Sequence, residues 1–370
     1  MDEVRDRLVG WLRLLVDAGA VTGTERRLAD DLETVLGLDY DVERVGDSLI
    51  VGSPTGTRPV IALVGHIDVV PPTEIDLPMR IESVEGTDIA YGRGTSDMHA
   101  GNAVALELFT QQAALGDAAP ADIVLVLYAR EEGPADANEL AEVLTQVSWL
   151  RDIDLAIILE PTDGQLQAGC LGGVHATVTF HGQQAHSARP WHGRNALTAA
   201  GPFLAALDAL QPKVVMIDGI EYRDVWSATM ASTTSARNVI PGEFSVNLNL
   251  RFAPSRDADT AVAELRQQVA AWTASLDGSG ATVTVEVVDI APPAPPRMDA
   301  TLLQQLVEVT GAEVAGKQAW TDIARFAALG VPAVNYGPGM TTQAHQRGEH
   351  VAVDAVVDVF DRLSLFLGEA

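Results

Sequence analysis

Cysteine, basic residues and long uninterrupted apolar runs are all scarce in this sequence. The single cysteine, Cys170, excludes an intramolecular disulfide framework and fits a reducing compartment. No stretch approaches the roughly 20 clean apolar residues that a membrane-spanning helix needs. The first residues alternate charged with apolar side chains, and they lack the basic start and apolar run of a signal peptide. We therefore expect a soluble cytoplasmic protein with no membrane partner.

The shortage of basic residues leaves a large negative charge. Lys and Arg number 24 against 51 Asp and Glu, which gives a formal net charge of −27 at pH 7. Nucleic acids and anionic membranes require a basic surface, so the charge excludes them as partners. Two interpretations of the acidity stay open: it attracts cationic substrates or metal ions, or it solubilises the surface, for instance in a salty cytoplasm.

The apolar residues that are present predict an α/β fold. Hydrophobic residues make up 47% of the 370 residues, which excludes wholesale disorder and suggests two domains. Short, non-alternating apolar runs at 60–64, 123–128 and 155–159 are typical of strands buried on both faces. Helical patterns lie between them, and a later run at 331–335 should join the same sheet. Strands that alternate with helices indicate a largely parallel sheet.

Two further patterns complete this expected domain. The segment Thr22-Gly-Thr-Glu25 resembles a capping box that starts a helix through Leu36. Residues 137–150 predict another helix after the second strand.

The middle of the chain reads as a separate domain. From about residue 174 the expected order is strand, helix, strand, strand, helix, strand, which is the ferredoxin-like α+β arrangement. A proline-rich link at 291–296 then returns the chain to the first domain. We therefore predict a discontinuous catalytic domain of residues 1–173 and 290–370, with an inserted lid and dimerisation domain of residues 174–289.

Metal-binding side chains follow each buried strand. His66 follows the first run after Gly65, Glu131 and Glu132 follow the second, and Glu160 follows the third. The carboxyl ends of parallel strands meet at one edge of an open sheet, where ligands gather. Two loops bring further candidates, Asp97 before a helix and His345 after the last strand. Imidazole and carboxylate groups suit zinc, with cobalt or manganese as substitutes, so the set predicts a metal site.

Taken singly, each of these residues has an ordinary structural explanation. A lone His66 could be a hydrogen-bonded structural histidine, the pair Glu131-Glu132 a solvated acidic pair, and Asp97 a loop residue. Glu160 could simply end a strand, and His345 could lie on the surface. Their joint placement at predicted strand ends and adjacent loops favours the metal site.

Several segments resemble one enzyme family. They are GHIDVVP, YGRGTSDMHAG, AREEG, LEPT and the late GPG followed by AH, together with GxxAHSARPxxGRNAL in the inserted domain. Along essentially the whole chain they are similar to the acetylornithine deacetylase/succinyl-diaminopimelate desuccinylase family of di-zinc amidohydrolases. GCLGG, ARNVIP and WTDIARFAALGVPAVNYGPG look most like the desuccinylases of actinobacteria.

The resemblance implies a role for each metal-site residue. His66 and Glu160 would hold one zinc ion, Glu132 and His345 the other, and Asp97 would bridge them. Asp68 would orient the His66 imidazole through a hydrogen bond. Glu131 would stay off the metal ions as the general base. The expected cofactor is thus two Zn²⁺ per subunit, with Co²⁺ or Mn²⁺ possible in the second site.

The resemblance also implies contributions from the inserted domain. His186 would reach the active site of a partner subunit and donate to the oxyanion, which requires a homodimer; alternatively it is a strand-end or interface histidine. Asn238 and Arg251 match positions that hold substrate carboxylates, although Arg251 could instead form a surface salt bridge. Thr321 and Gly337 would shape the pocket floor. GCLGG lacks an arginine that many desuccinylases carry, and Arg189 is a candidate replacement.

The implied activity is hydrolysis of the amide bond of N-succinyl-LL-2,6-diaminopimelate in lysine and diaminopimelate biosynthesis. The alternatives are the same chemistry on another N-acyl amino acid such as N-acetylornithine, or on a dipeptide. A non-catalytic relative that keeps the fold as a binding module is a further alternative.

Other reactive side chains are set aside. We expect His99 to be a surface group or a neighbour of the ligands, prefer His345 to His350, and expect Cys170 to be structural. Ser96 and Ser187 lack an evident His/Asp relay, which disfavours serine hydrolase chemistry.

Overall fold

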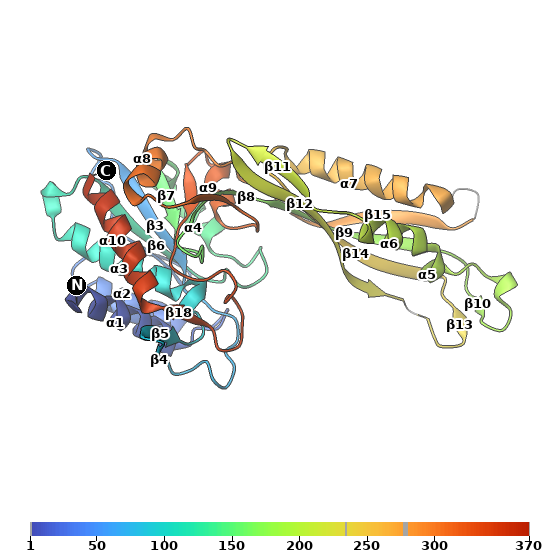
Figure 1. Cartoon of the computed structure of the whole chain (residues 1–370), viewed down its shortest axis with the longest axis horizontal. Helices are drawn as coiled ribbons and strands as arrows, with labels where there is room; N and C mark the ends of the chain where they lie inside the picture. Colours follow the sequence, from blue (N-terminus) through green and yellow to red (C-terminus); the bar gives the residue numbers. More distant parts are fainter. Residues whose placement is uncertain (1, 234, 277–279, 370) are drawn as a thin grey trace. The chain divides into compact units, whose positions relative to one another are not determined.

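The computed structural model describes residues 2–233, 235–276 and 280–369 (Figure 1). It divides into two compact units, which are Met1–Ala168, Pro296–Ala315 and Arg325–Ala370 for unit 1, and Gly169–Pro295 with Gly316–Ala324 for unit 2. Unit 2 thus takes in residues 169–173, 290–295 and 316–324, which the sequence analysis assigned to the first domain. Hydrogen bonds explain the last segment, because Leu171 N–H donates to the Ala319 oxygen and Trp320 Nε1 to the Pro292 oxygen.

Unit 1 is built on a mixed sheet. Within the described residues its eight strands run in the order β1-β2-β6-β3-β7-β17-β8-β16. The four central strands are β6 (Asp122–Tyr128), β3 (Val60–His66), β7 (Leu155–Ile158) and β17 (Ala333–Asn335), and they are parallel. The flanking strands β2 (Ser48–Val51) and β8 (Leu166–Cys170) are antiparallel to them, and β1 (Val42–Val45) and β16 (Val314–Lys317) form the edges. The predicted α/β sheet is confirmed, with antiparallel strands at both sides.

The central strands are apolar because they are covered on both faces. Every residue of β3 and β7 is buried, which matches their non-alternating apolar sequence. Helices α1 (Asp2–Ala18), α3 (Ala100–Ala113) and α10 (Val353–Glu369) pack together, and α3 packs against β3 and β6 (Figure 1). The remaining longer helices of this unit are α2 (Arg26–Leu36), α4 (Leu140–Gln146), α8 (Thr301–Thr310) and, across the unit boundary, α9 (Ile323–Ala328). Among the described residues, no helix has the length and apolar character to cross a membrane.

The expected capping box is wrong. Helix α2 begins at Arg26 after Glu25, whose side chain makes no capping hydrogen bond. The Thr22 hydroxyl instead donates to Asp68 Oδ2 at 2.8 Å, and Glu25 Oε1 accepts the Gly23 N–H at 2.8 Å. The helix expected over 137–150 also breaks, into α4 and the short turn Ser148–Arg151.

A small antiparallel sheet supports the loops around the candidate site. It consists of β4 (Arg80–Val84), β5 (Thr87–Tyr91) and β18 (His350–Ala352), in the order β18-β5-β4. Strand β5 leads into the segment that carries Asp97, and β18 follows the loop that carries His345. The pairing of His350 with Tyr91 therefore brings these two loops side by side.

Unit 2 contains the predicted β-α-β-β-α-β arrangement. Its sheet runs β11-β12-β14-β9-β15, with β9 (Gly172–His181), β12 (Ile220–Ser232), β14 (Glu243–Phe252) and β15 (Thr282–Ala291). Buried and half-buried residues alternate along β9 and β14. Helices α5 (Ala196–Ala199), α6 (Gly201–Asp208) and α7 (Ala258–Thr273) contribute side chains to the same apolar core as the buried strand residues. The helices therefore cover one face of the sheet, and the other face is polar.

Strand β11 (Lys213–Ile217) was not predicted. It pairs with the start of β12 through the two-residue turn Asp218-Gly219, where both residues have positive φ. Asp-Gly between two apolar runs is a recognised hairpin signal, so the sequence did contain the information.

Candidate metal-binding site

Three neighbouring parallel strands carry the candidate residues to one edge of the unit 1 sheet. His66 is the last residue of β3 and pairs in register with Tyr128, the last residue of β6. Glu131 and Glu132 follow β6 within four residues, and Glu160 follows β7. Side chains from distant parts of the sequence thus meet because parallel strands end at a common edge.

Asp97 lies between two histidines. Its Oδ1 is 3.3 Å from His66 Nε2, and its Oδ2 is 3.5 Å from His345 Nε2. His345 Nε2 also lies 2.9 Å from Glu132 Oε1. Ligand atoms of His66, Asp97 and Glu132 all fall within 4.8 Å of one another, a spacing that one metal ion could bridge.

The charge of this cluster calls for a cation. Burial by itself lowers the pKa of His66, but the hydrogen bond from its ring to Asp97 and the charges of Glu131 and Asp68 outweigh it and raise that pKa well above its ordinary value. The hydrogen bond to Glu132 raises the pKa of His345. Carboxylates around two imidazoles therefore stabilise positive charge, and this donor set of nitrogen and oxygen atoms fits zinc or a related divalent ion.

The ring of His66 is held so that Nε2 faces the cluster. Its Nδ1 lies 2.9 Å from the main-chain oxygen of Asp68, and 3.7 Å from the carboxylate Oδ1 of the same residue. A carbonyl can only accept, so Nδ1 carries a proton, and Nε2 is the nitrogen that would bind a metal ion in place of its own proton. Asp68 thus contacts the ring mainly through its main chain rather than through the carboxylate.

The Asp68 carboxylate binds the turn that carries both glutamates. Oδ1 accepts the Glu131 N–H at 3.0 Å, and Oδ2 accepts the Glu132 N–H at 3.1 Å. The turn is possible because Arg130 adopts a positive φ of 65°, which points successive N–H groups toward one anion. The Thr22 hydroxyl supplies a further donor to Oδ2 at 2.8 Å. The sequence analysis did not identify Thr22 as part of the site, because its position before Glu25 was interpreted as a capping box.

Glu160 is fixed by a close approach of two segments. Its side chain is buried, and Gly337 passes directly over the end of β7. A Cβ at Gly337 would lie 2.4 Å from the Leu159 oxygen and 2.5 Å from the Glu160 oxygen, so only glycine fits. Gly337 therefore sets the spacing between the two segments at Glu160.

The three histidines near the site differ in their surroundings. His345 is exposed and has a positive φ of 61°, a left-handed backbone state that is uncommon for non-glycine residues. His350 is half-buried, packs its ring 5.1 Å from that of Tyr91, and has Nδ1 3.0 Å from the Gly348 oxygen. His99 is buried, and burial lowers its pKa to about 3, so the surface position considered for it is wrong.

The candidate residues of unit 2 lie in different local settings. His186 is exposed on β10 (Ala185–His186), and its Nδ1 accepts the Ala188 N–H at 3.0 Å, which leaves the ring proton on Nε2. Arg189 and Asn238 are also exposed, and the Asn238 oxygen accepts the Ser187 N–H. Arg251 Nη1 lies 3.0 Å from where a Gly173 Cβ would be, so the last glycine of GCLGG leaves room for the guanidinium.

Two remaining candidates of this unit are buried. Thr321 is 4% exposed, and its main-chain oxygen lies 3.8 Å from Cys170 Sγ. Burial raises the pKa of the Cys170 thiol to about 11, which disfavours the thiolate that a metal ligand or nucleophile needs. Cys170 therefore has the structural character expected of it.

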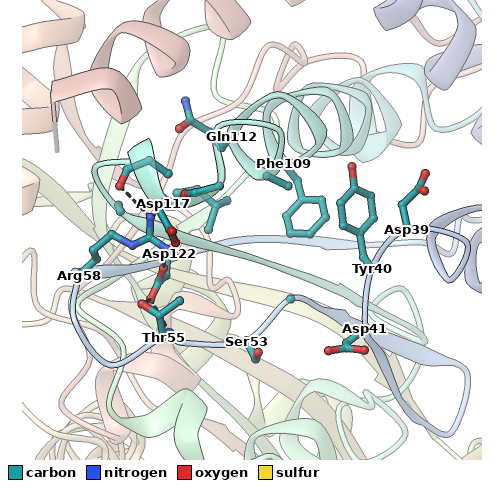
Figure 2. A pocket seen from close by; sticks show the side chains of 16 residues that line it. Asp39, Tyr40, Asp41, Ser53, Thr55, Arg58, Phe109, Gln112, Asp117 and Asp122 are labelled. Carbon is teal, nitrogen blue, oxygen red and sulfur yellow. Dashed lines mark hydrogen bonds and ion pairs between the residues drawn. The ribbon is translucent and has the colours of Figure 1, made fainter.

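A separate surface cavity of about 380 Å³ lies in unit 1 (Figure 2). Both terminal nitrogens of its basic group, Arg58, are engaged: Nη2 pairs with Asp122 at 2.8 Å and Nη1 donates to the oxygens of Gly116 and Ala119. The ring of Tyr40 meets that of Phe109 edge-on on another wall. These contacts tie strand ends to the end of α3, and they contain none of the candidate catalytic residues.

Comparisons with known proteins agree with this geometry. Residues 62–369 match the family described as Peptidase family M20/M25/M40. The chain is 36% identical over 375 residues to the succinyl-diaminopimelate desuccinylase of Corynebacterium glutamicum, which covers 100% of this chain and 98% of the relative.

Solved structures share the fold at low identity. Aminopeptidase PepT of Bacillus cereus has a TM-score of 0.76 and 17% identity, over 99% of this chain and 98% of its own. The Bacillus subtilis YXEP protein, a dinuclear metal-binding peptidase of the M20 family, has a TM-score of 0.70 and 17% identity, over 100% of this chain and 99% of its own.

Proposed function

Because the chain belongs to peptidase family M20/M25/M40, we propose that it hydrolyses the amide bond of N-succinyl-LL-2,6-diaminopimelate to succinate and LL-2,6-diaminopimelate. The observation that carries the substrate is the 36% identity, along the whole chain, to a succinyl-diaminopimelate desuccinylase. The cluster of His66, Asp97, Glu132 and His345 supports metal-dependent chemistry. The reaction belongs to lysine and diaminopimelate biosynthesis, and the lone cysteine favours the cytoplasm as its place.

We assign two Zn²⁺ ions to this cluster, with Co²⁺ or Mn²⁺ able to replace the second. His66 and Glu160 would hold one ion, Glu132 and His345 the other, and Asp97 both. When bound, such a pair of ions polarises the substrate carbonyl and makes water acidic enough to lose a proton near neutral pH. The position of Asp97 between His66 and His345 supports its shared role.

Glu131 acts as the general base. It takes a proton from water as the water oxygen bonds to the acyl carbon, and it returns that proton to the amine nitrogen as the C–N bond breaks. Asp68 supports this division of labour, because its carboxylate accepts the N–H groups of Glu131 and Glu132 and so fixes the main chain from which both side chains extend.

His186 donates to the developing oxyanion from a partner subunit. The hydrogen bond from Ala188 to Nδ1 supports this role, since it leaves an N–H on Nε2 to donate. A dimer is supported by β12: β11 pairs only with Ile220–Asp224, so in the described residues the outer edge of 225–232 has no strand partner. Met230 on this stretch is 74% exposed.

Substrate carboxylates are bound by residues of the inserted unit. Arg251 is the main candidate, because its planar guanidinium can bind a carboxylate through two hydrogen bonds. Asn238 and Arg189, which are exposed beside the His186 strand, supply further donors. Thr321 and Gly337 shape the pocket floor. Division of the chain into a catalytic and an inserted domain fits this distribution of roles.

Substrate comparison tests the proposal. The zinc-loaded protein should have a higher kcat/KM for N-succinyl-LL-2,6-diaminopimelate than for N-acetylornithine or dipeptides. A preference for one of the rivals by more than about tenfold, or roughly 1.4 kcal/mol of transition-state discrimination, would overturn the substrate while leaving the hydrolytic chemistry in place.

A further inference from the structure

Glu349 is a buried carboxylate that binds the main chain around Asp97. Its side chain is 1% exposed. Oε1 accepts the N–H groups of Ser96 at 2.8 Å and Asp97 at 2.9 Å, and Oε2 accepts the Gly94 N–H at 2.9 Å. A single side chain thus satisfies three main-chain donors of the segment that carries Asp97.

This segment needs an external acceptor because of its backbone conformation. Gly94 has a positive φ of 84°, and Asp97 and Met98 have non-helical angles in the turn that precedes α3. Their N–H groups cannot enter a helical or strand ladder, and buried N–H groups without acceptors are costly. The Glu349 carboxylate supplies the hydrogen-bond acceptors that a helix or strand would otherwise provide.

Arg93 neutralises the buried charge. Its side chain is 4% exposed, and Nη1 donates to Glu349 Oε2 at 2.8 Å while Nη2 pairs with Asp76 Oδ2 at 3.2 Å. Asp76 in turn accepts the Gly348 N–H at 2.9 Å, next to Glu349 in the chain. A buried carboxylate is tolerated when its lone pairs are filled and an opposite charge is adjacent, and both conditions hold for Glu349.

Glu349 also lies on the loop that carries His345. The Ser96 hydroxyl donates to the His350 oxygen at 2.7 Å, and the Gly92 N–H to the Glu349 oxygen at 2.9 Å. These contacts lock the Asp97 segment to the His345 loop, so the distance between the Asp97 carboxylate and His345 Nε2 depends on them.

We propose that Glu349, paired with Arg93, is a positioning residue. It holds Asp97, the ligand shared by both metal ions, at a fixed distance from His345. It does not touch a metal ion; it acts through the main chain of residues 94–97. The inference deepens the proposed function and rests on it, because it concerns the geometry of the metal ligands.

The substitution Glu349→Gln tests this role. Both carboxylate oxygens accept from donors, so either orientation of the amide places an NH₂ group against a donor. Glu107→Gln is the matched control: Glu107 is 2% exposed and pairs with Arg7 Nε at 2.7 Å, but none of its hydrogen bonds reaches the Asp97 segment. Both substitutions remove one buried charge beside an arginine.

The measurement is titration of metal-free protein with Zn²⁺ against a chromophoric chelator, beside the thermal midpoint of the metal-free proteins. We expect Glu349→Gln to weaken zinc binding about 10–100-fold, as loss of partners behind metal ligands typically does. Glu107→Gln should bind zinc within about twofold of the wild type even where its midpoint falls. Equal zinc affinity in Glu349→Gln and the wild type would overturn the inference.

Two further outcomes of the titration can be distinguished from these. If the wild type binds no zinc, the metal site itself fails, whatever Glu349 does. If Glu349→Gln does not fold, the substitution Arg93→Lys tests the inference instead. Lysine keeps the positive charge, but its single amino group cannot bind Glu349 and Asp76 as the two terminal nitrogens of arginine do. Weaker zinc binding by folded Arg93→Lys supports the positioning role, and wild-type affinity contradicts it.

Discussion

His345 Nε2 lies 2.9 Å from Glu132 Oε1, although the two residues are separated by 213 positions in the sequence. Glu132 comes from the turn after β6, and His345 from the loop before β18. His345 reaches this position with a positive φ, a backbone state that is uncommon for non-glycine residues. The metal ion that we propose Glu132 and His345 to share would account for their proximity.

The first prediction concerns the choice between neighbouring histidines. His345→Ala should weaken zinc binding by more than about 100-fold, since it removes a ligand rather than a partner of one. His350→Ala, at the start of β18 directly after that loop, is the control, and it should bind zinc like the wild type. Zinc titration of metal-free protein separates them, and equal losses in both variants would remove His345 as a specific ligand.

Glu131 and Glu132 should respond differently to the same change. Glu131→Gln should keep its metal and lose about 10²–10⁴-fold in kcat, because it removes the base. Glu132→Gln should lose metal as well as activity. Metal analysis and steady-state kinetics on both proteins give the answer, and an unchanged kcat in metal-loaded Glu131→Gln would exclude Glu131 as the base.

Thr22 should matter through Asp68. Thr22→Val removes the hydroxyl that donates to Asp68 Oδ2, which should cost about 1–2 kcal/mol of unfolding free energy and lower kcat severalfold by loosening the 131–132 turn. Thr24→Val is matched, because among the described residues the Thr24 hydroxyl donates to the Val21 oxygen and not to a residue of the site. Denaturant unfolding and kinetics on both variants test this. A loss of stability without a loss of kcat in Thr22→Val would make Thr22 purely structural.

A mixed dimer tests the role of His186. If His186 serves the partner's site, mixing inactive Glu131→Gln with His186→Ala and allowing subunits to exchange should restore roughly one quarter of the wild-type rate. Half of the dimers would then be mixed, and each would contain one complete site. His186→Ala alone sets the baseline. No gain after exchange, verified by mass spectrometry of the mixed species, would argue that His186 does not act across subunits.

The sequence predicted the parts of the site that follow from strand direction. His66, Glu131, Glu132 and Glu160 each end or follow a buried apolar run, and parallel strands bring such positions together. The order of strands and helices in unit 2 could be predicted equally well from the sequence, because its strands alternate buried and half-buried residues. Periodicity and chain direction suffice for features of this kind.

Other features depend on contacts that have no local signal. Thr22 looked like a helix cap because the spacing to Glu25 fits one, yet its hydroxyl serves Asp68. Glu349 could not be placed at the site from the sequence, since the main-chain donors that it binds lie more than 250 residues away. The segment 316–324 joins unit 2 through main-chain and side-chain hydrogen bonds that cannot be predicted from its composition.

The metal content of the purified protein tests the central claim most directly. After dialysis against metal-free buffer, elemental analysis should find close to two transition-metal ions per chain in the wild type, and their removal by a chelator should abolish amide hydrolysis until zinc is restored. Fewer than about one tightly bound ion per chain, or full activity after chelation, would contradict a two-metal hydrolase built on His66, Asp97, Glu132, Glu160 and His345.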